Sequence, residues 1–312
     1  MSNKLVVIVG VLDKLGSTNI SQAKSFYKLG FNVVPINYRT IITKYGKDIF
    51  YDILLETIKK YKPFLTVFSK CNGFESDIID QCNKYTNTWL FCMDPIATIE
   101  QCLEVVEHAK RTHFSSCTGL DIAGWFVKNG VKNCFHLLQG VDQDVFKPIE
   151  IDEAYKADVS FIGQKTQERE EFKKVLVNKG IDVKFYGNGF GKEVLNEEFA
   201  KVCSSSKFML SMNTVNNIHT DYFSNRMLRY LACGSCTLHY DTTGTLDKYF
   251  INEKDIFYFK DINELIKLID TIDSVTAYKT GMNGREKVLN GFTWEKTSAA
   301  MLNAVVEKIN VS

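Results

Sequence analysis

The stretch that decides the fold is residues 4–37, where "KLVVIVG" (4–10) and "FNVVPIN" (31–37) flank "ISQAKSFYKLG" (20–30). The two outer segments are short apolar runs of the length that buried strands have. The middle segment places apolar residues at helical spacing and ends at a glycine. A strand, a helix and a second strand in this order indicate a βαβ unit, and therefore a parallel sheet covered by helices.

The same alternation continues to about residue 140, stops, and then restarts. A helical stretch covers 44–60, and further strands are expected in "FLTVFSK" (64–70), "TWLFCMDP" (88–95), "HFSSCTG" (113–119) and "CFHLLQG" (134–140). Residues 141–157 have no periodicity and contain Pro148, which is typical of a linker. The pattern resumes in "DVSFIGQ" (158–164), "DVKFYGNG" (182–189), "KFMLSMN" (207–213), "SCTLHYD" (235–241) and "DIFYFKD" (255–261).

We therefore predict an α/β protein with two Rossmann-like, doubly wound domains that face a cleft. The first covers residues 1–145 and the second covers residues 146–292. Residues 293–312 are expected to form a C-terminal helix that packs on the first domain.

Composition narrows the class of protein. The 312 residues are 45% hydrophobic and 24% charged, and 38 Lys and Arg against 37 Asp and Glu give a formal charge of +1. These values exclude disordered and collagen-like chains and give no global basic field of the kind that non-specific nucleic-acid binders use. No apolar stretch approaches the length of a membrane span, and the run before Gly10 is too short for a signal peptide. A cytoplasmic protein is expected.

The nine cysteines have an odd count and no framework of spacings, which indicates reduced, mostly buried thiols. "CGSC" (233–236) matches C-x-x-C, but no second Cys/His pair accompanies it. We interpret it as two core residues around a turn and expect no metal site.

Candidate ligand-binding residues follow the strands of the second domain, because ligands of such sheets bind outside the carboxyl ends of the strands. Cations after "FIG" and beside a helix N-terminus suit a diphosphate, although a solvated polar loop is the simpler interpretation. In "DYFSNRMLRYLACG" (221–234), an arginine in the first helical turn is unfavourable for the helix dipole and indicates a bound anion. The predicted donor-side residues are Gly163, Gln164, Lys165, Arg169, Tyr186, Asn188, Asp221, Asn225, Arg226, Arg229, Gly244 and Thr245.

The first domain has fewer candidate ligand-binding residues. Gly10 and Gly16 do not have the G-x-G-x-x-G spacing, so a nicotinamide site is poorly supported. Asp94 follows a strand and can face the cleft, although a cap on the helix near Ile96 explains it equally well.

Together these segments resemble the GT-B glycosyltransferases, in particular the glycosyl transferases group 1 superfamily and its spore-maturation CgeB-like branch. "LLQGVDQDVFKP" is similar to the interdomain stretch of that superfamily, "VSFIGQ" to the opening of its donor domain, and "SNRMLRYLACG" to its helix that ends in "A-C-G". "GREKVLNGFTW" looks like its C-terminal segment, after which a helix crosses back to the first domain. The likeness spans nearly the whole chain and is strongest in the second half.

The chain departs from this superfamily at one position. Many members have two glutamates with seven residues between them, and here the matching positions hold Asp221 and Arg229. An arginine cannot accept hydrogen bonds from sugar hydroxyls. Either another residue holds the ribose, or Arg229 serves a different donor, or the site is degraded.

The resemblance implies transfer of a sugar from a nucleotide-diphosphate sugar, with a UDP-sugar as the expected donor, to a hydroxyl acceptor, without a metal or other cofactor. Arg226, with Arg169 and Lys165, would neutralise the diphosphate, and Asp94 would act as the base. One alternative is glycosylation of modified bases in DNA, for which a basic first-domain face would come from Lys14, Lys24, Lys28, Arg39, Lys44 and Lys47. Others are a non-catalytic sugar-nucleotide or glycan-binding protein, or a two-domain binder or epimerase. The donor sugar, the acceptor and the stereochemical outcome stay open.

Overall fold

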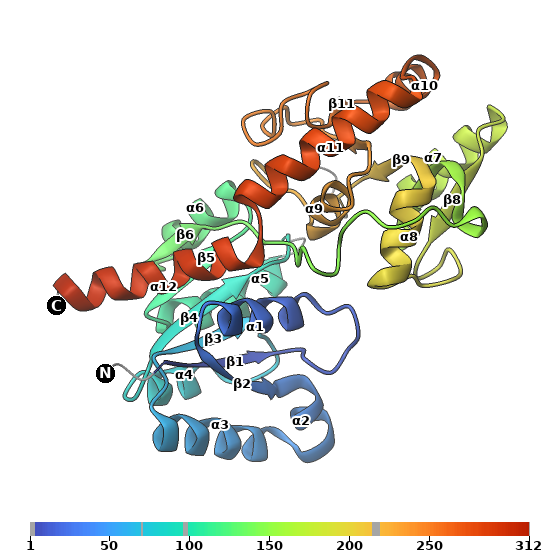
Figure 1. Cartoon of the computed structure of the whole chain (residues 1–312). Helices are drawn as coiled ribbons and strands as arrows, with labels where there is room; N and C mark the ends of the chain where they lie inside the picture. The colour runs from blue at the N-terminus through green and yellow to red at the C-terminus, as the bar shows by residue number, and fades with distance from the viewer. Residues whose placement is uncertain (1–3, 70, 96–98, 214–218, 312) are drawn as a thin grey trace. The chain divides into compact units, whose positions relative to one another are not determined.

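The chain forms two compact units of parallel α/β structure. The computed structural model describes residues 4–69, 71–95, 99–213 and 219–311. One unit consists of Met1–Gly140 with Trp294–Ser312, and the other of Val141–Thr293. Each contains one parallel sheet with helices packed against it (Figure 1). The predicted pair of Rossmann-like domains is confirmed.

The sheet of the first unit has six strands in the order β2-β1-β3-β4-β5-β6, and every pair is parallel. The strands are β1 (Leu5–Gly10), β2 (Asn32–Asn37), β3 (Leu65–Ser69), β4 (Asn87–Cys92), β5 (Phe114–Cys117) and β6 (Cys134–His136). The inner strands β1, β3, β4 and β5 are buried on both faces, as a doubly covered parallel sheet requires, whereas the edge strands β2 and β6 are partly exposed.

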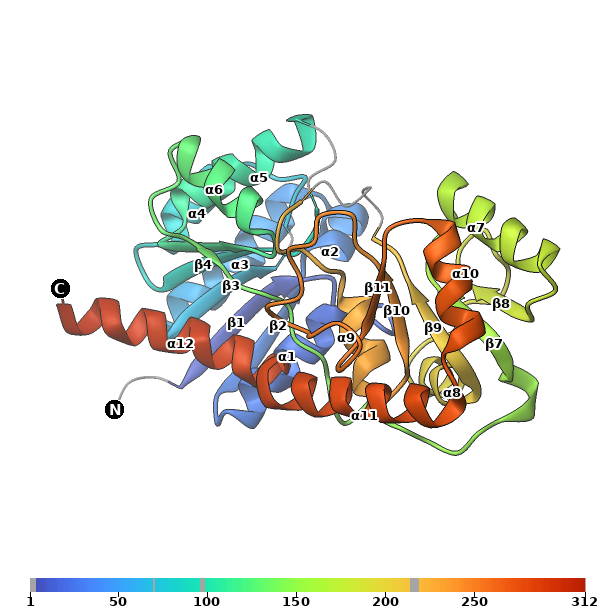
Figure 2. The same ribbon diagram turned by 90° about the horizontal axis from the view of Figure 1, so that it is seen from above.

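Helices cover both faces of this sheet (Figure 2). They are α1 (Thr18–Lys28), α2 (Tyr38–Tyr45), α3 (Lys47–Tyr61), α4 (Asp77–Cys82), α5 (Ile99–Arg111), α6 (Leu120–Lys128) and α12 (Trp294–Val311). Phe26 of α1 and Trp294 of α12 join the core on one face, and Phe50 of α3 and Phe126 of α6 join the core on the other.

The C-terminal helix α12 packs against α1 within the first unit, as the sequence predicts. The hydroxyl oxygens of Ser25 and Ser298 lie 2.6 Å apart, and Lys28 pairs with Glu295 at 2.7 Å. The predicted helix at 44–60 is instead two helices, because Gly46, with φ of 88°, separates α2 from α3. A backbone conformation of this kind favours glycine.

The second unit has five parallel strands in the order β11-β10-β9-β7-β8. They are β7 (Ala157–Ile162), β8 (Val183–Tyr186), β9 (Ser206–Ser211), β10 (Thr237–Tyr240) and β11 (Phe257–Phe259). The helices are α7 (Gln167–Asn178), α8 (Glu197–Ser205), α9 (Asn225–Ala232), α10 (Ile262–Thr271) and α11 (Ser274–Gly291). Leu176 of α7 and Leu265 of α10 pack on the same face of this sheet, whereas α8 and α9 contact its strands and α11 packs on α9.

The predicted linker contains little regular structure. Within 141–157 the structure has one short 3-10 helix, η1 (Glu153–Tyr155), and an isolated bridge between Val141 and Thr293. Over the described ranges of the chain, no helix is both long and apolar enough to cross a bilayer.

Candidate functional site

The carboxyl ends of β7, β9 and β10 are neighbours in the second sheet, and most of the predicted donor-side residues lie there. Gly163 follows β7, Met212 follows β9, and α9 begins at Asn225. Because the strands are parallel, all their carboxyl ends meet at one edge, which is where ligands of doubly wound sheets bind.

Arg226 lies in the first turn of α9. Its guanidinium carbon is 4.9 Å from the centroid of the Phe161 ring, and its Nη1 donates to the carbonyl of Met212 at 3.0 Å. A Cβ on Gly163 would lie 3.1 Å from this guanidinium, so the glycine leaves the space that Arg226 fills. Among the residues that the structure describes, no carboxylate pairs with Arg226. Its positive charge is therefore available to an anion.

Arg169, in the first turn of α7, points inward and is only 1% exposed. Its Nη1 donates to the carbonyl of Gln164 and its Nη2 to the carbonyl of Met212, both at 2.7 Å. Its guanidinium also lies 5.0 Å from the centroid of the Phe161 ring. Arg169 thus joins the chain segments that follow β7 and β9, and it contacts the same aromatic ring as Arg226.

Arg229 turns toward the segment that opens the second unit. Its guanidinium carbon lies 4.6 Å from the centroid of the Phe146 ring, and the Phe146 ring packs edge-on against Phe199 of α8. The carboxylate of Asp142 is near enough for its charge to raise the pKa of Arg229. Arg229 therefore connects α9 to residues 142–146.

The charge of Arg226 acts on the other two guanidinium groups. Burial, followed by the charge of Arg226, lowers the pKa of Arg169 and of Arg229. Burial also lowers the pKa of Arg226. A concentration of like charge at partly desolvated positions is costly unless an anion compensates it. The electrostatics therefore favour an anionic ligand beside Arg226.

The N-terminus of α9 has no side-chain cap. Ser224 occupies the N-cap position, but its hydroxyl accepts no N–H of the helix. Its Oγ is buried and has no partner among the described residues, while its own N–H donates to Oδ1 of Asn213 at 3.2 Å. Asn225, the first residue of α9, is buried as well. Helix N–H groups that the N-cap side chain leaves unoccupied, beside an arginine, form an anion-binding arrangement.

Asp221 is buried in a left-handed backbone conformation, with φ of 56° and 2% exposure. Lys248 donates to its Oδ2 at 2.7 Å, and the N–H of Asp221 donates to the hydroxyl of Thr245 at 3.0 Å. Its Oδ1 is buried and has no hydrogen-bond partner within the described part of the chain. A buried oxygen of this kind is well suited to accept a hydrogen bond from a ligand hydroxyl.

In the predicted Thr/Gly turn, the backbone N–H groups donate to side chains of the turn itself. The N–H groups of Thr243 and Gly244 donate to Oδ1 of Asp241 at 2.9 and 3.0 Å. The N–H of Thr245 points to the hydroxyl of Thr243 at 3.4 Å. The hydroxyl of Thr243 also donates to Oδ1 of Asp241, at 2.7 Å, so the side chain of Asp241 fixes the turn.

The loops after β7 and β8 pair with each other through the backbone. Gly163 N donates to the carbonyl of Tyr186 at 2.9 Å, and Lys165 N to the carbonyl of Asn188 at 2.8 Å. A Cβ on Gly187, whose φ is 109°, would lie 2.5 Å from the carbonyl oxygen of Gly163, so only glycine permits this approach.

The side chains of these loops are differently placed. Gln164, Lys165 and Asn188 are exposed, while Tyr186 is half-buried beside Tyr155. The ammonium group of Lys165 lies 3.2 Å from a carboxylate oxygen of Glu170, so part of its charge is compensated.

The first-unit candidates come from different elements: Asp94 follows β4, Lys28 ends α1 and Lys47 begins α3. Asp94 is exposed just after β4. Of the cations that would form a basic face, Lys28 and Lys47 are paired with carboxylates, at 2.7 and 2.6 Å.

Sequence reasoning missed three residues of the second-unit site. Lys248 pairs with Asp221 across 27 positions of the chain, and nothing in the sequence marks that partnership. Asn213 supports Ser224 from the end of β9. His239, on β10, is fully buried, with its Nδ1 2.9 Å from Oγ of Ser211, and burial lowers its pKa to about 4. The pattern of a polar residue at a strand end is a signal that would have found Asn213.

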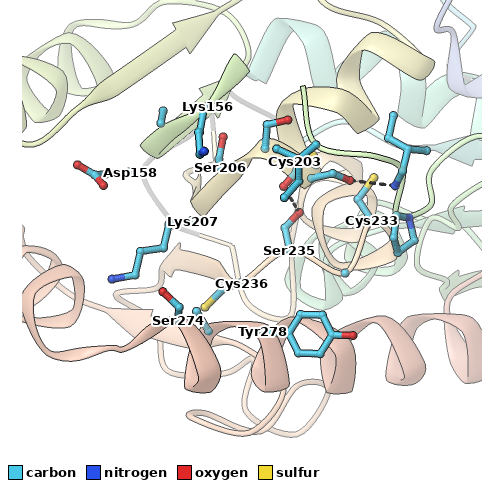
Figure 3. Close-up of a pocket in the computed structure, with 18 of the residues that line it drawn as sticks. Lys156, Asp158, Cys203, Ser206, Lys207, Cys233, Ser235, Cys236, Ser274 and Tyr278 are labelled. Carbon is cyan, nitrogen blue, oxygen red and sulfur yellow. Dashed lines mark hydrogen bonds between the residues drawn. The ribbon is translucent and has the colours of Figure 1, made fainter. Parts of the chain in front are cut away.

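A cavity of about 740 Å³ also occurs in the second unit, but at the opposite edge of the sheet (Figure 3). It is lined by residues at the amino ends of β7 and β9, including Ala157 and Lys207, and by Cys233 and Tyr278. Ligands of open α/β sheets bind at the carboxyl ends. We therefore keep this cavity separate from the candidate donor site.

Comparison with known proteins supports the assignment of the fold. Residues 166–303 match a family described as Glycosyl transferase-like. No curated protein sequence matches the chain.

Several solved structures share the fold over nearly the full length of both chains. A sucrose-phosphate synthase from Thermosynechococcus elongatus superposes with a TM-score of 0.67 at 13% identity, covering 99% of this chain and 100% of that one. A glycosyltransferase from Rickettsia africae gives 0.62 at 11% identity, covering 99% of each chain. A mutant of T4 phage BGT, in complex with UDP-glucose, gives 0.57 at 15% identity, covering 96% of this chain and 98% of that one.

At such low identity these structures establish the fold alone, and the family match concerns the second unit with the start of α12. The chain has the GT-B fold of two parallel α/β sheets, and residues 166–303 form its glycosyl transferase-like region.

Proposed function

We propose that the chain is a glycosyltransferase that moves a sugar from a nucleotide-diphosphate sugar to a hydroxyl acceptor. The single observation that carries this proposal is Arg226, a partly desolvated guanidinium at an uncapped helix N-terminus with no carboxylate partner in the described structure. The match of residues 166–303 to a glycosyl transferase-like family supports a nucleotide-diphosphate sugar as the anion that binds there. A UDP-sugar is the expected donor, and within this fold we propose the CgeB-like branch on the motif "LACG" (231–234).

The chemical task is to stabilise the diphosphate as the bond to the sugar breaks. Negative charge develops on the leaving oxygen, and preorganised donors in a site of low dielectric stabilise it strongly. Arg226 and the first N–H groups of α9 are the donors that we assign to this role. Arg169 donates to two carbonyl oxygens and so keeps the segments after β7 and β9 in place. Its positive charge adds to that of Arg226. No metal ion is required in this scheme.

The other donor-side residues take supporting roles in the proposal. Oδ1 of Asp221 would accept a hydrogen bond from a ribose or sugar hydroxyl, with Lys248 fixing the carboxylate. The exposed side chains of Gln164 and Asn188 and the ring of Tyr186 would contact the base, because they follow the neighbouring strands β7 and β8.

On the acceptor side we propose Asp94 as the base that takes the proton of the acceptor hydroxyl. It follows β4 at the carboxyl edge of the first sheet, the edge at which α/β domains bind their ligands. A reducing compartment, the cytoplasm, is the proposed setting, because the cysteines that the structure describes are all free thiols.

The proposal is tested by incubating the protein with a panel of nucleotide sugars, with and without a chelator, and measuring nucleotide diphosphate release. Release that persists in the chelator and falls in Arg226→Ala and in Asp94→Asn supports a metal-independent transferase. Tight binding without release in any condition would instead identify a non-catalytic sugar-nucleotide binder. Binding of none of the nucleotides would contradict the donor site itself.

A further inference from the structure

Three cysteine side chains lie on one face of the first sheet, on adjacent strands. Cys92 ends β4, Cys117 ends β5 and Cys134 begins β6, and Cys92 and Cys117 are direct partners in the parallel register. The sulfur atoms of Cys117 and Cys134 are 3.8 Å apart, within hydrogen-bonding distance. Cys92 is near enough to contribute to the raised pKa of Cys117, although burial is the largest cause.

The metal interpretation of this cluster finds no support. In the part of the chain that the structure describes, no three His, Cys, Asp or Glu side chains are arranged to hold a metal ion. What the cluster does provide is a pair of thiols whose sulfur atoms already face each other.

The members of the pair differ in access to solvent. Cys117 is fully buried, whereas Cys134 is only partly buried, because β6 is a strand of three residues at the edge of the sheet. A second thiol pair offers a comparison. Cys203 and Cys233 are near enough for Cys233 to raise the pKa of Cys203, but they are 1% and 3% exposed. A reagent in solution therefore reaches Cys134 before it reaches either member of the second pair.

The pair also differs in reactivity. The hydrogen bond from the Cys117 thiol lowers the pKa of Cys134, while burial raises the pKa of Cys117. The thiolate is the nucleophile of thiol–disulfide exchange, and the partly buried thiol meets a reagent before the fully buried one, so Cys134 is the attacking group and Cys117 the resolving group.

We propose that Cys134 and Cys117 form a thiol-oxidation site that reacts with small-molecule disulfides. The Cys134 thiolate attacks one sulfur of the reagent, which forms a mixed disulfide on Cys134 and releases one thiolate. Cys117 then loses its proton and attacks Sγ of Cys134, which forms the Cys117–Cys134 disulfide and releases the second thiolate. Both cysteine protons leave on the two released thiols, and the reagent disulfide is the oxidant.

The product needs a movement of the backbone. In the parallel register Cys134 lies opposite Ser115 and Cys117 opposite His136, so the two cysteines are diagonal neighbours. The two sulfur atoms must approach from 3.8 Å to about 2.05 Å, and the two Cα atoms must come within about 6.8 Å, so β6 must shift along β5. Since β6 pairs with β5 alone among the described strands, this shift disturbs one strand pairing.

Cys117 is followed by Thr118, whose hydroxyl donates to the carbonyl of Met93 at 3.2 Å, and Met93 precedes Asp94. Oxidation therefore acts on the strand end that carries the proposed acceptor-side base.

The test treats the fully reduced full-length protein with oxidised glutathione and follows intact mass and peptide mapping over time. In the wild type we expect loss of two hydrogen atoms and one cross-linked peptide pair that contains Cys117 and Cys134. In Cys117→Ser the reaction stops at the first step, and the protein gains one glutathionyl group on Cys134. Cys134→Ser remains unmodified at Cys117, and Cys203→Ser, the matched control, behaves as the wild type.

The proposal is wrong if the wild type keeps every thiol free under conditions that oxidise a small dithiol. It is equally wrong if the first cross-link joins Cys203 and Cys233, or if Cys134→Ser is oxidised at Cys117 as fast as the wild type. The circular dichroism spectrum of each variant is compared with that of the wild type. Matching spectra show that the mass changes were measured on folded protein.

Discussion

At the scale of single residues, the sequence and the structure lead to different interpretations of Arg229. The sequence presents it as a charged substitute for a sugar-binding glutamate. In the structure it lies over Phe146 and beside Asp142, at the start of the second unit. Arg229 therefore holds residues 142–146 against α9, and we assign it a positioning role in the proposed enzyme.

This role predicts separate effects on stability and affinity. Arg229→Ala should lower the free energy of unfolding by about 1–2 kcal/mol, since it removes a cation–π contact and leaves Asp142 without its neighbouring charge. The affinity for UDP should change less than threefold. Chemical denaturation and calorimetry on the same sample check both values, and Phe146→Leu should reproduce the loss of stability. A large loss of affinity with unchanged stability would place Arg229 on the donor instead.

Asp221 gives a second prediction at this scale. Asp221→Asn keeps the size of the side chain but weakens acceptance at Oδ1 and the ion pair with Lys248. If Oδ1 accepts a hydroxyl of the sugar, the variant should bind a UDP-sugar about tenfold more weakly, a loss of about 1.4 kcal/mol, and bind UDP unchanged. Equal weakening of UDP and UDP-sugar would point to a ribose contact. Unchanged binding of both would remove Asp221 from the site.

The structure brings most of the predicted second-unit residues to one edge of the sheet, because the motifs fall at strand ends and parallel strands bring those ends together. That these residues bind a donor stays a prediction. The sequence could not predict which side chains contact one another. Nothing in a linear pattern shows that Arg169 donates to two carbonyls, or that Lys248 reaches Asp221, since both depend on how loops fold over the sheet edge.

At the scale of secondary-structure elements, the paired loops after β7 and β8 depend on Gly187. Its left-handed conformation and its approach to Gly163 both exclude a side chain. Gly187→Ala should therefore cost about 1–3 kcal/mol of stability and weaken UDP binding, because the loop that follows β7 must move. Gly180→Ala is a matched control, since Gly180 also has positive φ but has open space around it. If the two substitutions change stability and UDP affinity equally, backbone strain alone explains the effect of Gly187→Ala, and the close approach to Gly163 does not contribute.

Strand β10 carries a pH-dependent element in His239. Burial lowers the pKa of His239 to about 4, below the ordinary value of about 6.5. Between these values the unfolded chain binds a proton that the folded chain does not, so stability falls as the pH decreases from about 6.5 to 4.

Denaturant titrations at several pH values measure this dependence. His239→Gln should flatten the slope in that range, while the remaining slope reflects other groups, such as His108 and His113, whose pKa burial also lowers. An identical slope in wild type and variant would mean that His239 is not held in its neutral form by the fold.

The elements themselves were largely predictable, because apolar runs of strand length and helices of 3.6-residue period alternate so regularly. The exceptions lie at glycines and turns. The stretch 44–60 has a continuous helical pattern, but the positive φ of Gly46 divides it, and hydrophobic periodicity does not detect such a break.

At the scale of the whole molecule, α12 completes the first unit although it lies at the far end of the chain. Trp294, Met301 and Val305 are buried in the core that α1 also joins. Trp294→Ala should therefore destabilise the protein by about 3–5 kcal/mol. A first thermal transition that moves to lower temperature, with the second unit still stabilised by UDP, is the expected result. An unchanged thermal profile would contradict the assignment of α12 to that core.

The central claim is that the N-terminus of α9 and Arg226 bind the diphosphate of a nucleotide sugar, and calorimetric titration with UDP tests it most directly. Arg226→Ala should bind UDP about 10- to 100-fold more weakly than the wild type, the effect of losing a charge-assisted contact. Arg111→Ala, which removes an exposed arginine paired with Asp80 in the first unit, should bind as the wild type does. Binding of UDP that is equally strong in Arg226→Ala, or no binding of any nucleotide diphosphate by the wild type, would contradict the account.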